Sequence, residues 1–137
     1  MPNGNGGRGQ IPAPVIPPAI QTLKFSFQHL DHLSERFPLS GCGPEFLRQF
    51  LHTIHEMSSW TVEQFTDQNN RERRHVIDFS ETCEPHGFSN LDQDQLAYHE
   101  SWQFCLLPTE QWRVHGILID DTFFVVWLDQ NHVLYAH

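Results

Sequence analysis

The C-terminal segment 112–135 constrains the fold more than any other part of the chain. Two runs rich in β-branched and aromatic residues, 112–119 and 122–129, flank the turn-forming pair Asp120-Asp121. This is the pattern of an antiparallel hairpin. The second run is apolar without interruption over 123–128, as expected of a strand that is buried on both faces. The segment therefore predicts a β-hairpin inside a sheet.

Four polar residues lie within or just beyond this apolar hairpin: Arg113, His115, Asp129 and His132. If the two strands pair about the turn, Arg113 and Asp129 lie nearly opposite each other, one residue out of register, and His132 lies just past the strand end. A cation, a titratable imidazole and a carboxylate that converge at one end of a sheet are unusual in a purely structural hairpin. We therefore predict a functional site at this end of the sheet.

The rest of the chain predicts further strands and two helices. The patterns indicate a half-buried strand at 23–28, a helix at 44–57, a short helix that starts at the capping box Thr61–Gln64, strands at 75–79 and 102–107, and a helical turn near 92–99. This order of elements predicts an α+β fold, with an antiparallel sheet of four to five strands and two N-terminal helices packed on it.

Length and composition indicate one domain. The 137 residues leave room for one modest core, which we assign to 21–137. Residues 1–20 are rich in proline and glycine and predict a disordered arm. The three cysteines form no Cys-x-x-Cys pair, and no apolar run is long enough to span a membrane. These features predict a cytoplasmic protein without a membrane segment.

The charge balance limits how the chain can bind nucleic acid. Seventeen acidic and eight basic side chains give a formal net charge of −9, which disfavours broad electrostatic adhesion to a phosphate backbone. Any RNA contact must then use a local basic patch. The cluster Arg71, Arg73 and Arg74 is the candidate for following phosphates, with His115 as a further RNA-binding candidate. A solvated loop is the competing interpretation of the cluster.

The C-terminal residues, taken with the order of elements, resemble the RelE/YoeB type of bacterial toxin, small endoribonucleases that cut messenger RNA on the ribosome. The resemblance rests on Trp102-Gln-Phe-Cys-Leu, Trp112-Arg-Val-His, the Asp-Asp turn, the apolar strand after it, and the terminal Asn131-His132 with Tyr135 behind. In the YoeB branch, an arginine on the penultimate strand and a histidine at the chain end have a similar separation. Arg113 and His132 match those positions.

The resemblance implies roles for individual residues. Metal-independent RNA cleavage needs a base for the 2′-hydroxyl proton, a cation for the phosphate and an acid for the leaving oxygen. The family's glutamate base corresponds in region to Glu81 or Glu84. Arg113 is then the cation, because its planar fork can hold two phosphate oxygens. His132 is the acid, and Tyr135 positions the substrate. We predict no metal and no cofactor.

Structural roles compete with these assignments. Arg113 also fits a cross-strand salt bridge to Asp129 or a helix carboxylate, and His132 also fits a turn residue at the hairpin end. The stretch Glu81-Thr-Cys-Glu-Pro-His86 offers metal ligands, but no further well-spaced ligands accompany it, so a solvated loop is the preferred interpretation. Cys83 beside His86 lacks the oriented base and oxyanion donors that a nucleophile needs.

Two hypotheses about function follow. The leading one is an RNA-cleaving toxin of a bacterial toxin–antitoxin or defence system, whose partners are an antitoxin or other protein and RNA or the ribosome. The competing one is a non-catalytic binding module on the same fold, which holds a protein partner or a small charged ligand between Arg113 and His132. The placement of these two residues favours the nuclease, and the acidic charge favours the binding module. The oligomeric state stays open.

Overall fold

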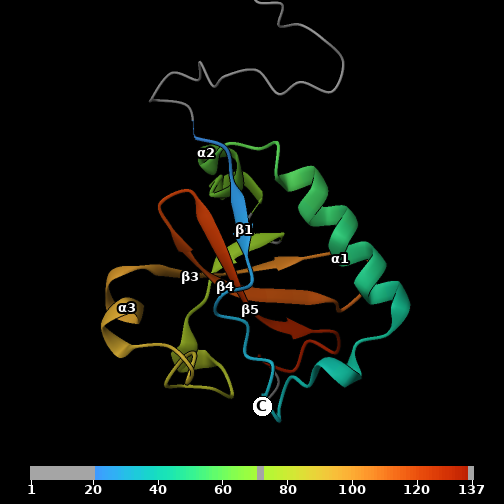
Figure 1. The fold of residues 1–137 in the computed structure, drawn as a ribbon, viewed down its shortest axis with the longest axis vertical. Helices are drawn as coiled ribbons and strands as arrows, with labels where there is room; N and C mark the ends of the chain where they lie inside the picture. Colours follow the sequence, from blue (N-terminus) through green and yellow to red (C-terminus); the bar gives the residue numbers. More distant parts are fainter. Residues whose placement is uncertain (1–20, 71–72, 136–137) are drawn as a thin grey trace, which may run out of the picture.

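A five-stranded sheet forms the centre of the structure (Figure 1). The computed structural model describes residues 21–70 and 73–135. The predicted arm at 1–20 and the candidate Arg71 lie outside the described residues. Within the described ranges the chain combines one sheet with three α-helices, which confirms the predicted α+β class.

The elements follow the predicted order along the chain. The strands are β1 (Lys24–Ser26), β2 (Arg74–Val76), β3 (Glu100–Cys105), β4 (Arg113–Ile119) and β5 (Thr122–Asp129). The α-helices are α1 (Pro44–Met57), α2 (Val62–Phe65) and α3 (Gln93–Tyr98), and short 3-10 turns occur at Leu39–Gly41, Gln68–Asn70 and Phe79–Glu81. The predicted bounds of α1 agree with the structure at both ends.

The sheet is mixed, with the strand order β1-β5-β4-β3-β2. Strands β2 to β5 pair antiparallel, whereas β1 pairs parallel with β5, Lys24 opposite Thr122 and Ser26 opposite Phe124. The prediction of a wholly antiparallel sheet is therefore wrong for β1. A tight hairpin forces neighbouring strands to run antiparallel, but the long connection between β1 and β5 leaves their relative direction open.

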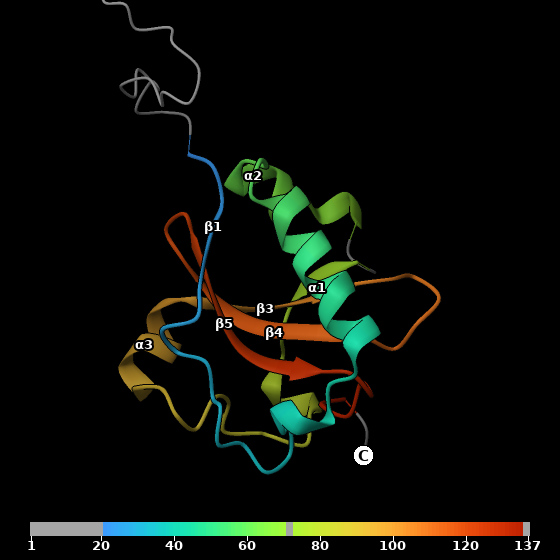
Figure 2. The same cartoon turned by 45° about the vertical axis from the view of Figure 1, so that its right-hand side comes forward.

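Helix α1 covers one face of the sheet (Figure 2). It begins at Pro44, because a first-turn proline lacks only an N–H that has no helical partner. Its buried residues are Phe46, Phe50, Thr53 and Met57. Leu47 and Leu51, which follow Phe46 and Phe50 along the helix, are 40% and 59% exposed. Only a narrow side of the helix is therefore buried.

Helix α2 closes the same face beside the end of α1. The predicted capping box is present: the Gln64 N–H donates to the Thr61 hydroxyl at 3.1 Å, and the Thr61 N–H donates to the Gln64 side-chain oxygen at 2.8 Å. The cap directs Phe65 into the core, where it is fully buried. The buried residues of this first core are Leu23, Phe46, Phe50, Met57, Phe65, Trp102, Phe104, Leu106, Val114, Phe123, Val125 and Leu128.

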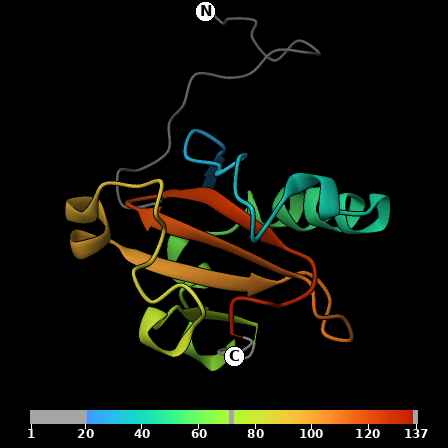
Figure 3. The ribbon, with the colours of Figure 1, turned by 90° about the horizontal axis from the view of Figure 1, so that it is seen from below.

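The opposite face of the sheet packs against loops and short turns, and not against a long helix (Figure 3). These segments come from the chain before α1, from the region between β2 and β3, and from the residues after β5. The buried residues of this second core are Phe37, Ile77, Phe88, Leu91, Ile117, Val126, Trp127 and Leu134. A face covered by loops leaves room for polar side chains to reach the surface between them.

A β-bulge shifts the register between β4 and β5 by one residue. Gly116 pairs with Val125, but the preceding residue, His115, pairs with Trp127. Val126 is the extra residue on β5. Because of it, Val126 and Trp127 both belong to the second core.

The bulge also decides where Asp129 points. Along a regular strand, Val125 and Asp129 would project to the same face, and Val125 belongs to the first core beneath α1. After the bulge, Asp129 projects to the other face instead, where it meets His115. Arg113 then pairs directly with Asp129, and not one residue out of register as a regular hairpin predicts.

The packing of α1 gives a first prediction. Phe50 is 3% exposed, whereas Leu51 on the same helix is 59% exposed. We expect Phe50→Ala to lower the free energy of unfolding by about 3 kcal/mol, because truncating a buried ring leaves a cavity. Leu51→Ala, the control, should change it by no more than about 0.5 kcal/mol. Urea unfolding measures both, and equal midpoints for the two variants would contradict this placement of α1.

Candidate functional site

Three polar side chains cross the second face of the sheet. His75 on β2 pairs with Gln103 on β3, and Gln103 pairs with His115 on β4. Residues paired in register project to the same face, so His75, Gln103 and His115 form one line, which we call the polar row. The Gln103 amide nitrogen lies 3.0 Å from His75 Nε2. The row therefore begins near the edge strand β2 and runs towards the centre of the sheet.

The polar row ends at a buried pair, His115 and Asp129. His115 Nε2 lies 2.9 Å from the Asp129 carboxylate, and the two side chains are 0% and 1% exposed. The same carboxylate accepts the backbone N–H groups of Val133 at 2.9 Å and Leu134 at 3.1 Å. Asp129 thus holds both the imidazole on β4 and the turn that follows β5.

That turn carries the predicted residues His132 and Tyr135. His132 has a left-handed backbone with φ 55°, which places it in a tight turn, as one of the two sequence interpretations predicts. The turn is also tied to the second face by Cys83, whose N–H donates to the Leu134 carbonyl at 2.8 Å. Its thiol donates to the Val133 carbonyl at 3.3 Å. Cys83 therefore has a structural role here.

Tyr135 lies near two imidazoles. The centroid of its ring is 5.8 Å from that of His75 and 6.2 Å from that of His132. One imidazole comes from the edge strand β2, and the other comes from the turn after β5. All three rings are partly buried. Two imidazoles and a phenol from two separate segments therefore lie near one another on the second face.

Arg113 is close to this group of rings. Its guanidinium donates to the carbonyl oxygens of Glu110 at 3.0 Å and Trp112 at 3.1 Å. The predicted salt bridge to Asp129 does not form, because the carboxylate is occupied by His115 and two backbone N–H groups. Burial lowers the pKa of His132, and the positive charge of Arg113 lowers it further. Arg113 is therefore near enough to His132 for its charge to act on the imidazole.

Burial sets the protonation of the His115–Asp129 pair. It lowers the pKa of His115 below its ordinary value near 6.5, and the hydrogen bond to Asp129 opposes this only in part. For Asp129, burial raises the pKa, but the hydrogen bonds from His115 and the backbone outweigh it, so the pKa lies below 3.8. Near neutral pH the pair is a neutral imidazole that donates from Nε2 to an ionised carboxylate.

This protonation predicts a pH dependence of stability. The unfolded chain binds a proton at His115 near pH 6.5, whereas the folded chain resists it until a lower pH. The free energy of unfolding should therefore fall as pH drops below about 6.5. His115→Gln keeps an N–H donor for Asp129 but cannot titrate, so its thermal midpoint should fall less between about pH 7 and pH 5. Parallel decreases in the wild type and the variant would contradict the prediction.

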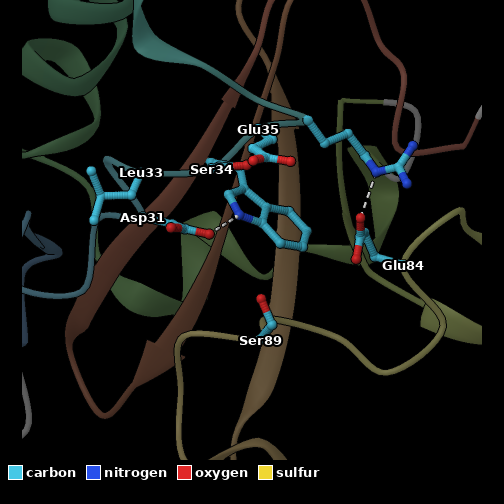
Figure 4. Close-up of a pocket in the computed structure, with 8 residues that line it drawn as sticks. Asp31, Leu33, Ser34, Glu35, Glu84 and Ser89 are labelled. Carbon is cyan, nitrogen blue, oxygen red and sulfur yellow. Dashed lines mark hydrogen bonds and ion pairs between the residues drawn. The ribbon is translucent and has the colours of Figure 1, made fainter.

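Glu84 and Glu81, the two candidates for the base, lie in different places in the structure. Glu84 pairs with Arg36 beside an open cleft of about 520 Å³ (Figure 4). Trp127 lines this cleft, but Arg113 and His132 do not. The prediction of Glu84 as a base beside these two residues is therefore not met, because its carboxylate is engaged elsewhere.

Glu81 is the candidate that stays near the site. It ends the 3-10 turn that follows β2. Burial raises the pKa of the Tyr135 phenol, and the carboxylates of Asp78 and Glu81 add to the rise. Glu81 is exposed, so solvent reaches its carboxylate.

The predicted RNA-binding residues differ in their exposure to solvent. Arg74 is buried, donates to the Phe65 carbonyl at 2.8 Å and stacks over the Trp60 ring at 4.7 Å, so it supports the fold and does not face a phosphate. His115 is fully buried, so RNA cannot contact it in this conformation. Both predictions are corrected by burial. Arg73 is exposed, as a phosphate contact requires.

Two members of the site were not singled out from the sequence. The sequence predicts His75 only as part of the strand at 75–79, and Gln103 only as part of the strand at 102–107. The signal for Gln103 was available, because an amide in the middle of the buried strand β3 must find hydrogen-bond partners. His75 gave no such signal, since its place beside Tyr135 depends on how the chain end folds back.

Within residues 21–70 and 73–135, no three His, Cys, Asp or Glu side chains lie close enough together to hold a metal ion. Across the described helices, none is both long and apolar enough to cross a membrane. Comparison of the chain with protein-family models, with curated proteins and with solved structures gives no match.

Proposed function

We propose that the chain is a metal-independent endoribonuclease of the RelE/YoeB-like type, acting as a toxin of a bacterial toxin–antitoxin or defence system. One observation carries the proposal: the Arg113 guanidinium is near enough for its charge to lower the pKa of His132, and the His132 ring lies beside a phenol that also adjoins a second imidazole. The order of one strand, two helices and then four strands, with the short helix α3 between β2 and β3, supports it as well, because the sequence resemblance implies a strand and two helices ahead of the remaining strands. An antitoxin, RNA and the ribosome are the partners that this function requires.

The reaction needs two proton transfers and one stabilised phosphate. A base takes the proton of the 2′-hydroxyl, whose oxygen attacks the phosphorus, and an acid protonates the 5′-oxygen that leaves. The products are a 2′,3′-cyclic phosphate and a 5′-hydroxyl, so no water or metal is consumed. Imidazoles suit both transfers, because their ordinary pKa lies near neutral pH.

Each site residue has a role in this scheme. His132 transfers a proton, because its ring is half-buried in the turn and makes no hydrogen bond with any residue that the structure describes. Arg113 holds the phosphate, since guanidinium stays charged and offers two parallel donors. Tyr135 orients the substrate between them. His75 or Glu81 supplies the second proton-transfer group, and their variants decide between them.

Cleavage by purified protein tests the proposal. Single-stranded RNA is incubated with the protein in EDTA, and the rate is compared among variants. His132→Ala should lower the rate by about 100-fold or more, the usual contribution of a general acid or base. Arg113→Lys keeps the charge but loses the planar fork, and should lower it by about 10-fold or more. His52→Ala, which removes an exposed histidine of α1, is the matched control.

Two outcomes would contradict the proposal. If the wild type leaves RNA intact, or if His132→Ala cleaves as fast as His52→Ala, the site is not a nuclease. A substrate with a 2′-deoxy sugar at the cut site should resist cleavage, because it lacks the attacking oxygen. In cells, induced expression of the wild type should stop growth, and expression of His132→Ala should not.

A non-catalytic binding module is the second candidate function. Two observations favour it: the net charge of −9, and the guanidinium of Arg113, which already donates to two backbone carbonyls. In that case His132→Ala weakens the binding of a protein partner or a small anion. Neither the wild type nor the variant then cleaves RNA or slows growth.

A further inference from the structure

One side of α1 carries apolar side chains that the core does not bury. Leu47 and Leu51 are exposed, and Ile54 is only partly buried. Their spacing along the helix places the three side chains one above another on the same side. Phe27, which follows β1, is also exposed, and its ring centroid lies 6.1 Å from that of Phe50 in α1. We call Phe27, Leu47, Leu51 and Ile54 the apolar flank.

The apolar flank lies on the side of α1 that faces β1. The other side of the helix carries Gln49, whose amide donates to the Leu106 carbonyl, just after β3. Leu47 and Leu51 each project roughly 160° away from Gln49 about the helix axis, because an α-helix turns about 100° per residue. In the sheet, β1 is an edge strand, and β5 and β4 separate it from β3. The apolar flank is therefore next to the β1 edge of the sheet.

The chain enters β1 close to this flank. Thr22 forms a β-bridge with Thr61, and the Leu23 N–H donates to the Trp60 carbonyl at 2.8 Å. The start of β1 is therefore fixed beside the link between α1 and α2 (Figure 1). The described part of the chain begins at Gln21, immediately before these contacts. The segment that precedes Gln21 is thus attached to the domain at one end of the apolar flank.

The sequence of 11–20 suits an apolar surface. All ten residues are apolar, and four of them are prolines: Ile-Pro-Ala-Pro-Val-Ile-Pro-Pro-Ala-Ile. Proline favours the extended polyproline II form, which needs no backbone partner and docks on surfaces that carry aromatic and apolar side chains. In that form ten residues span about 30 Å, whereas the helix from Met57 back to Leu47 is about 15 Å long. The segment is therefore long enough to reach the whole flank.

We propose that the segment 11–20 docks on the apolar flank of the same molecule and covers it. The attachment at Gln21 gives the segment an effective concentration in the millimolar range, so a contact too weak to join two separate chains is sufficient. The docked segment occupies an interaction surface of α1, and a protein partner that binds there must displace it. This inference does not depend on the proposed nuclease, whose site uses no residue of α1.

NMR of the full chain with labelled methyl groups tests the docking. Nuclear Overhauser effects are expected between the isoleucine and valine methyls of 11–20 and the side chains of Leu47, Leu51 and Phe27. Val15→Asp places a charge in the segment and should abolish these signals, because a carboxylate loses its hydration on an apolar surface. Asn5→Asp adds the same charge to the arm outside the segment. It is the matched control and should leave the signals unchanged.

A change on the flank itself gives the reciprocal test. Leu51→Asp should abolish the signals between 11–20 and the other flank residues, while the signals of the core stay in place because Leu51 is exposed. Leu33→Asp makes the same substitution at an exposed leucine outside α1 and should retain the signals of the docked segment. If Leu51→Asp fails to fold, Val15→Asp still decides the test, since it changes no residue of the core.

Three outcomes would overturn the inference. The first is a wild-type spectrum without signals between 11–20 and the flank. The second is signals that persist unchanged in Val15→Asp. The third comes from an equal mixture of labelled and unlabelled chains, in which only contacts between two molecules are selected. Signals in that mixture would show that the segment docks on a second copy of the chain, and not on its own flank.

Discussion

Asp129→Ala is expected to lower the free energy of unfolding by about 4 kcal/mol, because each buried donor left without its acceptor costs about 1–3 kcal/mol. The change removes the acceptor of three donors: His115 Nε2 and the N–H groups of Val133 and Leu134. All three would remain in the interior without a partner, which is the costly way to lose a hydrogen bond. For a chain of this length the loss corresponds to a thermal shift of about 10–15 °C.

Asp121→Ala on the same hairpin is the matched control. Asp121 pairs with Lys24 at 2.7 Å, but the two side chains are 27% and 61% exposed. Water screens such a pair, so its removal should cost no more than about 1 kcal/mol. Urea unfolding of both variants separates the two cases. Similar losses for Asp129→Ala and Asp121→Ala would show that Asp129 does not organise the chain end.

Gly116→Ala is expected to cost about 4 kcal/mol or more, beyond the usual range for an added methylene in a core. A Cβ at Gly116 would lie 2.3 Å from the Phe124 carbonyl oxygen and 2.4 Å from the Phe123 ring. The Phe123 ring cannot move aside easily, because it packs against the rings of Phe25, Phe65 and Phe104. Either the ring or the backbone of β5 must shift, and both hold the first core.

Gly41→Ala is the control for Gly116→Ala. The nearest atom to a Cβ at Gly41 is 3.6 Å away, an ordinary van der Waals contact. This change should alter the free energy of unfolding by no more than about 0.5 kcal/mol. If Gly116→Ala melts like Gly41→Ala, β4 and β5 are not as close as the register at the bulge requires. Because Gly116 adjoins the bulge, its variant should also perturb the NMR signal of His115.

The elements with strong local patterns were predicted well from the sequence. Helix α1 has a first-turn proline and regular apolar spacing, and the capping box fixes the start of α2. The hairpin of β4 and β5 follows from two β-rich runs around Asp120, whose left-handed φ of 55° suits an aspartate in a turn. In each case the information lies within a few residues of the element itself.

Features that depend on distant segments were not predictable in this way. The parallel partner of β1 lies at the other end of the chain, and neither strand signals the other. The bulge at Val126 cannot be recognised from the sequence, because every residue of the run 123–128 is apolar. The bulge nevertheless moves Asp129 to the other face of the sheet. His75 reaches Tyr135 only because the chain end folds back over the sheet. The candidate site was therefore predicted at its C-terminal half and missed on β2.

The parallel pairing of β1 with β5 has a consequence for the time course of folding. Lys24 finds its partner Thr122 only after nearly all of the described chain has been synthesised. Until then Phe25 and the apolar side of α1 have no sheet to cover, so the nascent chain carries exposed apolar surface that favours aggregation or chaperone binding. Contacts of such long sequence separation also slow the folding of the released chain. We therefore expect β1 to dock late in folding, after β5 has formed.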